Sequence, residues 1–360
     1  MAKQKKMSKS ARTYLTSFGL IGVFWGAIEI TKFAGALSSK AAGLLIPVCA
    51  YIMMAISLNL VVGFLGELSL GHAAFMSAGA FCGVFFYITA GANMPQGLAV
   101  VLAFLVGGLA AGIFGVIVGV PVLRLSGDYL AIVTLAFGEI LKNVLNSLYI
   151  GVDSTGVHFS LKDQFSLNLE PTGKVLMKGA MGITGIKKFS VFSVGILLIA
   201  LTLLFVLNLM NSRAGRAITA IRDDDIAAKS TGINLTKYKL MAFVSSAVIA
   251  GFAGVLYALN FASLVAKKFD YNLSINILVM VVLGGMGSIP GSIIAAIILT
   301  VLPELLRGFS QYRMFIYSIV LIIMMLFNRA PAFVMWRQRF AMKFKGAKGT
   351  EKAAAGKKEG

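Results

Sequence analysis

Few residues in this sequence have types and spacings suited to catalysis or metal binding. His72 and His158 are far apart, and neither lies in a cluster of Cys, His or Asp residues at the spacing of metal ligands. No Gly-x-Ser-x-Gly nucleophile motif occurs, and neither does a Gly-x-x-x-x-Gly-Lys-Ser/Thr loop of the kind that binds ATP phosphates. Cys49 and Cys82 lie in apolar runs, where cysteine is usually a small core residue. We therefore expect no metal, no cofactor, no ATP-binding site and no catalytic reaction on this chain.

Glu139 is the clearest candidate for a functional polar residue, because it lies inside an apolar stretch. Burying a charge in a membrane is expensive, so such residues usually mark a substrate or ion route, or pair with one another. Lys142 follows closely in the sequence. Two interpretations remain open: Glu139 lines a translocation route, or it forms a structural pair with Lys142 or with another helix.

A second polar stretch interrupts the apolar runs. It combines three glycines with three polar side chains: Gly63, Gly66, Gly71, Glu67, Ser69 and His72. Such interruptions are typical of discontinuous membrane helices, whose free backbone groups can meet a polar ligand. A hinge or lock at the cytoplasmic end of the helices is the alternative interpretation.

The elements that must position these residues are membrane-spanning helices. The chain has 360 residues, of which 58% are hydrophobic and only 13% are charged, and a soluble domain of this length would need more charge on its surface. Apolar stretches of about 20 residues recur, which is the length that crosses a bilayer. We predict an all-α polytopic membrane protein with about ten transmembrane helices. The predicted spans are 14–30, 42–65, 68–90, 97–120, 129–150, 190–210, 240–262, 273–283, 289–306 and 314–327.

The formal net charge of +19 includes basic clusters at both ends of the chain. Basic clusters beside spans follow the positive-inside pattern and attract anionic lipid head groups, so membrane lipid is an expected partner and nucleic acid is not. An even number of crossings then places both ends in the cytoplasm. We predict basic cytoplasmic tails at 1–13 and 331–360 and a transmembrane domain at 14–330, which carries an external loop at 151–189 and a cytoplasmic loop at 211–239.

Glycines recur at three- and four-residue spacing within one predicted span, at Gly108, Gly112, Gly115 and Gly119. Lipid supplies no hydrophobic drive between helices, so small residues on one stripe allow the close backbone approach that holds helices together. We predict that this stripe packs tightly against another helix, and a role in the sliding of helices past each other is the alternative.

The cytoplasmic loop at 211–239 is the most informative segment outside the spans. Asp223, Asp224 and Asp225 precede an alanine-containing run, where carboxylates can cap free N–H groups and meet the positive end of a helix. Gly232 follows where a helix would end in the left-handed conformation. The pattern predicts a rigid helix of about two turns that presents a small apolar surface between two spans. An ordinary solvated loop is the alternative.

This segment resembles the coupling loop of ABC importer permeases, in which Glu-Ala-Ala and a glycine are separated by three residues. Here Ala227 and Ala228 precede Gly232, with Ile226 in place of the glutamate and Asp225 one position earlier. Further motifs occupy 57–63, 66–75, 127–140 and 282–288. Their order and spacing, between about residues 50 and 328, are similar to the M-type (LivM-like) inner-membrane permeases of branched-chain amino acid ABC transporters.

The resemblance implies an inner-membrane permease that conducts branched-chain or related small amino acids by alternating access. It also implies a sister permease in a heterodimer, two cytoplasmic ATP-binding subunits and an external substrate-binding protein. The residues that it assigns to ATPase coupling are Arg222, Asp223, Asp224, Asp225, Ile226, Ala227, Ala228, Gly232 and Ile233. The candidates for the translocation pathway are Asn59, Glu67, Ser69, His72, Thr134 and Glu139.

Other functional classes remain open from the sequence. After residue 150 the chain lacks the Gly-Gly-Pro/Ala-Asp/Met-Gly run of many such permeases, so a urea or short-chain amide permease of the same architecture is the nearest alternative. An ion-coupled secondary transporter would use Glu139 as its coupling residue and would need no ATPase. A membrane-embedded enzyme would need paired catalytic groups within the spans, which the sequence does not show.

Overall fold

The computed structural model describes most of the chain. The described residues are 9–33, 35, 39–123, 128–153, 156–169, 171, 173–189, 191–306, 312, 315–316, 318–319 and 322. The chain forms two compact units, Met1–Val301 and Leu302–Gly360. All elements below lie in the first unit, apart from the last turn of the final helix.

Helices dominate the described residues, as the hydrophobic pattern predicts. The helices are α1 (Lys9–Phe33), α2 (Ser39–Asn59), α3 (His72–Thr89), α4 (Gln96–Val122), α5 (Asp128–Ser147), α6 (Phe192–Asn211), α7 (Arg213–Asp223), α8 (Asp225–Ser230), α9 (Leu235–Ala258), α10 (Tyr271–Gly284) and α11 (Ile289–Leu305). Within the described part, seven helices are long and apolar enough to cross a membrane, and α11 is a shorter apolar helix. The predicted helical membrane bundle is confirmed.

Nine of the predicted spans correspond to described helices. The helix α10 has only 14 residues, which agrees with the short span predicted at 273–283. The third predicted span begins later than expected, at His72, because the residues before it are not helical. The tenth predicted span, the tail at 331–360 and most of the tail at 1–13 lie largely or wholly outside the described residues.

A small antiparallel sheet, which the sequence did not predict, occupies much of the segment expected to be an external loop. Its strands are β1 (Tyr149–Val152), β2 (Val157–Ser160), β3 (Lys174–Lys178), β4 (Ile183–Thr184) and β5 (Ser263–Leu264), in the order β2-β1-β3-β4-β5. β5 follows α9, so the sheet joins two loops that are distant in sequence. In the turn between β2 and β3, Asp163 accepts hydrogen bonds from the Ser166 side chain and backbone, which lower the pKa of its carboxyl.

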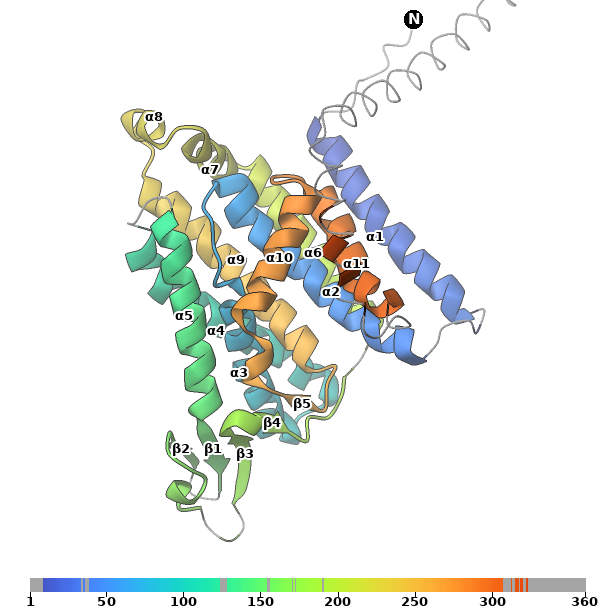
Figure 1. Cartoon of the computed structure of the whole chain (residues 1–360), viewed down its shortest axis with the longest axis vertical. Coiled ribbons are helices and arrows are strands. Elements are labelled where there is room, and N and C mark those ends of the chain that lie inside the picture. The colour runs from blue at the N-terminus through green and yellow to red at the C-terminus, as the bar shows by residue number, and fades with distance from the viewer. Residues whose placement is uncertain are drawn as a thin grey trace, which may run out of the picture. The chain divides into compact units, whose positions relative to one another are not determined.

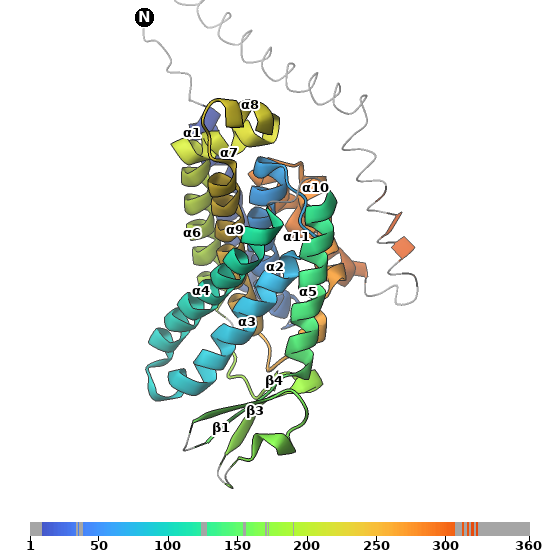
Figure 2. The same cartoon turned by 90° about the vertical axis from the view of Figure 1, so that its left-hand side faces the viewer.

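The sheet and the pair of helices α7 and α8 lie at opposite ends of the bundle, which we call the sheet end and the α7–α8 end (Figures 1 and 2). α5 runs from the α7–α8 end toward the sheet, and α6 returns from the sheet end to α7. The start of α1 also lies at the α7–α8 end (Figure 1). The fold therefore places the loop at 211–239 on one side of the spans and the loop at 151–189 on the other.

The bundle is centred on α3, α4 and α9, which pack against one another. The predicted glycine stripe of α4 faces α9: a Cβ on Gly108 would lie 2.3 Å from the Phe252 ring, and one on Gly115 would lie 2.8 Å from the Ala247 side chain. α3 and α9 approach even more closely, because a Cβ on Gly254 would lie 2.0 Å from the Met76 carbonyl oxygen. The prediction of tight packing through small residues is confirmed.

Candidate functional site

The helix α7 begins the loop at 211–239 and lies against the end of the bundle. Ser212 caps it, because its hydroxyl oxygen accepts hydrogen bonds from the backbone N–H groups of Ala214 and Gly215. Its buried face includes Ile218 and Ile221. The sequence prediction of a single short helix in this loop missed α7, although Ser212 and the apolar spacing of its inner face are the signals that identify it.

The second helix, α8, is the one that the sequence predicted. The Asp224 carboxylate accepts a hydrogen bond from the Ala227 N–H at 2.9 Å, and Asp225 is the first helical residue. Gly232 has a φ of +85°, and the Ile233 N–H donates to the Ala228 carbonyl at 3.1 Å, which closes the helix in the left-handed manner expected of a terminal glycine.

The surface of α8 combines one large apolar side chain with charged neighbours. Ile226 is 79% exposed, and Ala227 is exposed beside it. Ala228 is buried and Ile233 is half-buried, so these two residues attach the helix to the protein and do not extend its outer surface. Asp223, Asp224 and Asp225, together with Lys229, are exposed around this apolar point. The predicted apolar surface is therefore present but centres on Ile226.

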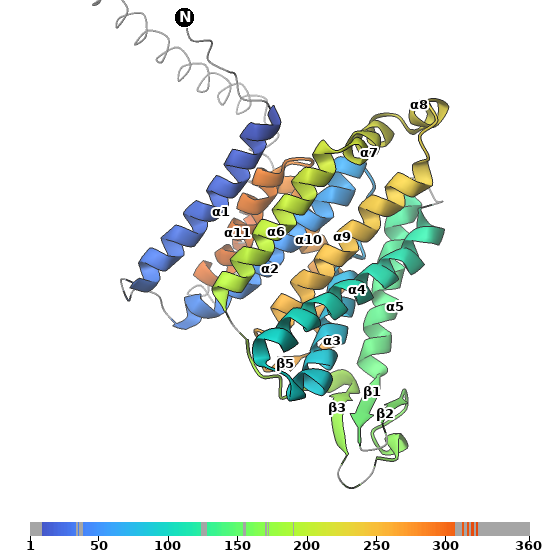
Figure 3. The ribbon, with the colours of Figure 1, turned by 180° about the vertical axis from the view of Figure 1, so that it is seen from behind.

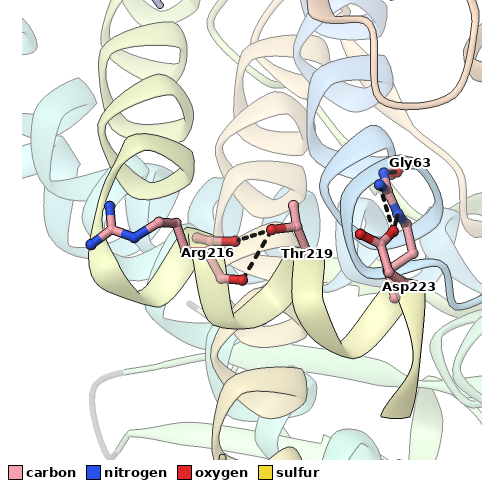
Figure 4. Close-up of polar contacts among 6 residues, drawn as sticks. Gly63, Arg216, Thr219 and Asp223 are labelled. Carbon is pink, nitrogen blue, oxygen red and sulfur yellow. Dashed lines mark hydrogen bonds and ion pairs between the residues drawn. The ribbon is translucent and has the colours of Figure 1, made fainter. Parts of the chain in front are cut away.

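Arg222 connects α7 to the bundle. One guanidinium nitrogen donates to the Gly63 carbonyl oxygen at 3.1 Å, and two others donate to the Asp223 carboxylate at 2.9 and 3.1 Å. Figure 4 shows Asp223 beside Gly63, whereas Arg216, on the same helix, points away from them. Gly66, with a φ of +82°, also lies against the Arg222 side chain, since a Cβ there would be 2.6 Å from its Cγ. The last turn of α7 is thus held against the segment that follows α2.

Asn59 extends this connection to the turn between α10 and α11. Asn59 is fully buried; its side-chain oxygen accepts from the Gly287 N–H at 2.8 Å, and its amide donates to the Ser292 hydroxyl at 3.1 Å. A Cβ on Gly63 would lie 1.9 Å from the same Asn59 oxygen, so only glycine fits there. Arg222, Gly63, Asn59 and Gly287 therefore form a continuous series of contacts from α7 to the α10–α11 turn.

The interruption predicted between the second and third spans is confirmed. Residues Leu60–Leu65 are π-helical, Gly66 is left-handed, and an extended segment leads into the bundle before α3 begins (Figure 1). Thr134 of α5 holds this segment, because its hydroxyl accepts from the Leu70 N–H at 3.1 Å. Gly71 packs so closely that a Cβ would lie 1.8 Å from the Thr134 carbonyl oxygen.

His72 and Ser69 are buried in and beside this interruption. The Ser57 hydroxyl lies 2.5 Å from His72 Nε2 and 2.9 Å from the Ser246 carbonyl oxygen, so it connects His72 to α9. The Ser246 hydroxyl donates in turn to the Ser57 carbonyl, which ties α2 to α9. Among the described residues, His72 Nδ1 and the Ser69 hydroxyl have no hydrogen-bond partner.

Glu67 forms an ion pair with Lys239, the fifth residue of α9. Their side chains are only 13% and 11% exposed, so little water screens the pair. The position beside α7 and α8 matches the interpretation of this stretch as a lock at one end of the helices. The sequence contained no sign of the partner, because Lys239 is 172 positions away.

Glu139 pairs with Lys142 on the same helix, as one of the two sequence interpretations proposed. The pair is partly exposed and lies beside the first turns of α3 and α10: Glu139, Gly71, Asp270 and Ser274 line one narrow gap. The Ser274 hydroxyl accepts from the Ala73 N–H at 3.0 Å, so the two helices begin next to each other. The six pathway candidates lie on four neighbouring segments: Asn59 ends α2, Glu67 and Ser69 lie in the interruption, His72 begins α3, and Thr134 and Glu139 lie on α5.

Comparison with known proteins identifies the family. The family model described as "Branched-chain amino acid transport system / permease component" matches residues 41–327. The chain is 36% identical over 325 residues to the high-affinity branched-chain amino acid transport system permease protein LivM of Escherichia coli (strain K12), covering 84% of this chain and 72% of LivM. LivM of Salmonella typhimurium (strain LT2) is 36% identical over 310 residues, with the same coverage.

A second permease of such systems is also similar. LivH of Salmonella typhimurium is 32% identical over 117 residues, which are 32% of this chain and 38% of LivH. No solved structure matches the chain. The family match, the two LivM relatives and the seven apolar helices agree with the motifs on which the resemblance was based. The chain belongs to the family of permease components of branched-chain amino acid transport systems, and it is a multi-pass inner-membrane protein.

Proposed function

We propose that this chain is the substrate-conducting permease of an importer for branched-chain or related small amino acids, driven by ATP hydrolysis in partner subunits. The observation that carries the proposal is the attachment of α7 to the bundle through Arg222 and Gly63. A motor subunit can move the spans only if the part that it grips is rigid and is fixed to them. α7 and α8 meet both requirements, because both helices are capped, α7 directly follows span α6, and α8 directly precedes span α9.

The exposed surface of α8 supports its role as the part that is gripped. Ile226 projects from the protein with most of its surface exposed. A large apolar side chain among carboxylates suits a protein interface with an apolar centre and a polar rim. We assign this interface to an ATP-binding subunit and place the α7–α8 end in the cytoplasm. The chain itself binds no ATP in this proposal and carries no cofactor.

Two connections can transmit a displacement of α7 and α8 into the bundle. The first runs from Arg222 through Gly63 and Asn59 to the α10–α11 turn. The second is the ion pair of Glu67 and Lys239, which joins the interruption to the start of α9. Both reach the discontinuous region between α2 and α3. Alternating access in this proposal consists of movement at that region.

The substrate route in this proposal passes the level at which α3 and α10 begin beside Glu139. The positive end of α3 suits a carboxylate, and a glutamate suits an ammonium group, so the two together match an amino acid zwitterion. The buried, unpartnered Ser69 hydroxyl and His72 Nδ1 support the assignment, because an unsatisfied polar atom is costly unless it meets a polar group at some stage.

The relatives support the choice of substrate and partners. LivM and LivH are both named as permeases of high-affinity branched-chain amino acid transport systems, and this chain is similar to both. We therefore propose a sister permease in a heterodimer, two ATP-binding subunits and an external substrate-binding protein that delivers the amino acid at the sheet end.

Uptake into vesicles that contain the chain with these partners tests the proposal. Radiolabelled leucine should accumulate only with ATP on the α7–α8 side, and unlabelled isoleucine and valine should compete, whereas urea should not. Accumulation that follows a proton or sodium gradient without any ATP-binding subunit would identify a secondary transporter instead. If urea competed and isoleucine and valine did not, uptake could still be driven by ATP, but the substrate would not be a branched-chain amino acid.

A further inference from the structure

An apolar groove runs between α4, α6 and α9 and has a volume of about 740 Å³. Figure 3 shows the three helices on one face of the bundle. Val101 and Leu105 of α4, Leu197 and Leu201 of α6, and Val248 and Phe252 of α9 are representative of its lining. Thr202 and Ser245 are the polar side chains that line it. A groove of this composition on membrane-spanning helices suits a hydrocarbon chain.

A second, smaller pocket lies next to the end of the groove, at the sheet end. The groove extends to Gly97 and Phe189, and the second pocket, of about 230 Å³, is lined by their near neighbours Gln96 and Lys187. Gln96 is the first residue of α4, so this pocket lies at the end of a span, where lipid head groups are found.

The pocket has one charged lining residue, Lys187, and Lys188 follows it in the sequence. Lys187 and Lys188 are both exposed, and among the described residues neither has an ion-pair partner. The Gln96 amide can donate hydrogen bonds to a phosphate oxygen. A lysine close to the membrane surface is attracted to anionic lipid head groups. Charge and depth therefore complement an anionic phospholipid.

We propose that the α4–α6–α9 groove binds a phospholipid with an anionic head group, whose acyl chain fills the groove and whose phosphate lies beside Gln96 and Lys187, with Lys188 adding positive charge next to the pocket. The site is independent of the proposed substrate route, because it shares no residue with the region around Glu139. A transmembrane helix of the sister permease is the competing occupant. It is less suited, because it would leave the two lysines without a counter-charge.

Lipid titration of the purified full-length chain, followed by native mass spectrometry, tests the site. The probes are dioleoyl phosphatidylglycerol, which is anionic, and dioleoyl phosphatidylcholine, which is not. We expect tighter binding of phosphatidylglycerol, and an affinity for it about tenfold lower in the double variant Lys187→Gln/Lys188→Gln. The matched control is Lys162→Gln/Lys174→Gln, which removes two exposed lysines at the same end of the protein and should leave binding unchanged.

The groove has its own pair of variants. Leu201→Trp should fill it and weaken binding of both lipids, whereas Leu204→Trp, on the same helix but outside the lining, should not. The proposal would be overturned if the wild type and all variants bound the two lipids with equal affinity, because the bound lipid would then be unspecific annular lipid. The proposal would also be overturned if Leu201→Cys formed a disulfide in membranes with a cysteine placed on a helix of the sister permease. Such a disulfide would show that protein, not lipid, fills the groove. Thermal unfolding of each variant separates loss of binding from loss of fold.

Discussion

Replacing Arg222 by glutamine should lower ATP-driven uptake by about tenfold or more while the importer still assembles in the membrane. The guanidinium makes a charge-assisted hydrogen bond to the Gly63 carbonyl at 3.1 Å, and bonds of this kind contribute roughly 1.5–3 kcal/mol. Glutamine is too short and carries no charge, so α7 would no longer be held to the segment after α2. Hydrolysis of ATP should continue, and the ratio of amino acid transported to ATP hydrolysed should fall. Vesicle uptake and phosphate release, measured on the same preparation, give this ratio.

Arg216→Gln is the matched control for this variant. Arg216 lies on the same helix and is exposed, and its side chain points away from Gly63 (Figure 4). Both substitutions remove one positive charge from α7, so a general electrostatic effect would appear in both. If uptake and its ratio to hydrolysis are unchanged in Arg222→Gln, the bond to Gly63 has no part in coupling.

Replacing Lys239 by methionine should lower the free energy of unfolding by about 3 kcal/mol, because it leaves the Glu67 carboxylate without its partner in a poorly hydrated position. The two side chains are only 11% and 13% exposed, so the energetics of a buried ion pair apply. Adding Glu67→Gln to this variant should restore more than half of the loss, since no unpaired charge then remains. Thermal unfolding in detergent measures both steps.

Lys237→Met provides the comparison, because Lys237 is exposed and lies two positions earlier on the same helix. It should change the unfolding temperature by less than about 1 °C, as is usual for exposed single charges. Equal effects of the two lysine variants, or no recovery in the double variant, would mean that the ion pair contributes little.

Local patterns in the sequence were sufficient for α8 and for the interruption after α2. In α8 the signals are the capping Asp224 and the terminal Gly232, both of which act within one or two turns of the chain. Gly66 acts in the same way, because its left-handed conformation favours glycine. Such features depend on neighbours in sequence, so a single sequence can reveal them.

The connections that give these elements a function depend on distant residues and could not be predicted. Arg222 reaches Gly63 across 159 positions, and Lys239 reaches Glu67 across 172. The sheet was missed for the same reason: β4 and β5 have two residues each, and their pairing joins Ile183 to Leu264. Strands this short carry no detectable alternation of polar and apolar residues, and tertiary contacts alone define them.

The role of α8 as the surface on which an ATP-binding subunit acts is tested most directly by a single cysteine at Ile226. The variant Ile226→Cys, made with Cys49→Ala and Cys82→Ala, is treated with a membrane-impermeant thiol reagent and with a short bifunctional cross-linker. Met181→Cys at the sheet end, where Met181 is 64% exposed, is the control for the opposite side. We predict that Ile226→Cys is labelled only from the side at which ATP acts and is cross-linked to an ATP-binding subunit. Labelling of Ile226→Cys from the same side as Met181→Cys, or a fully assembled importer in which it forms no such cross-link, would contradict this role.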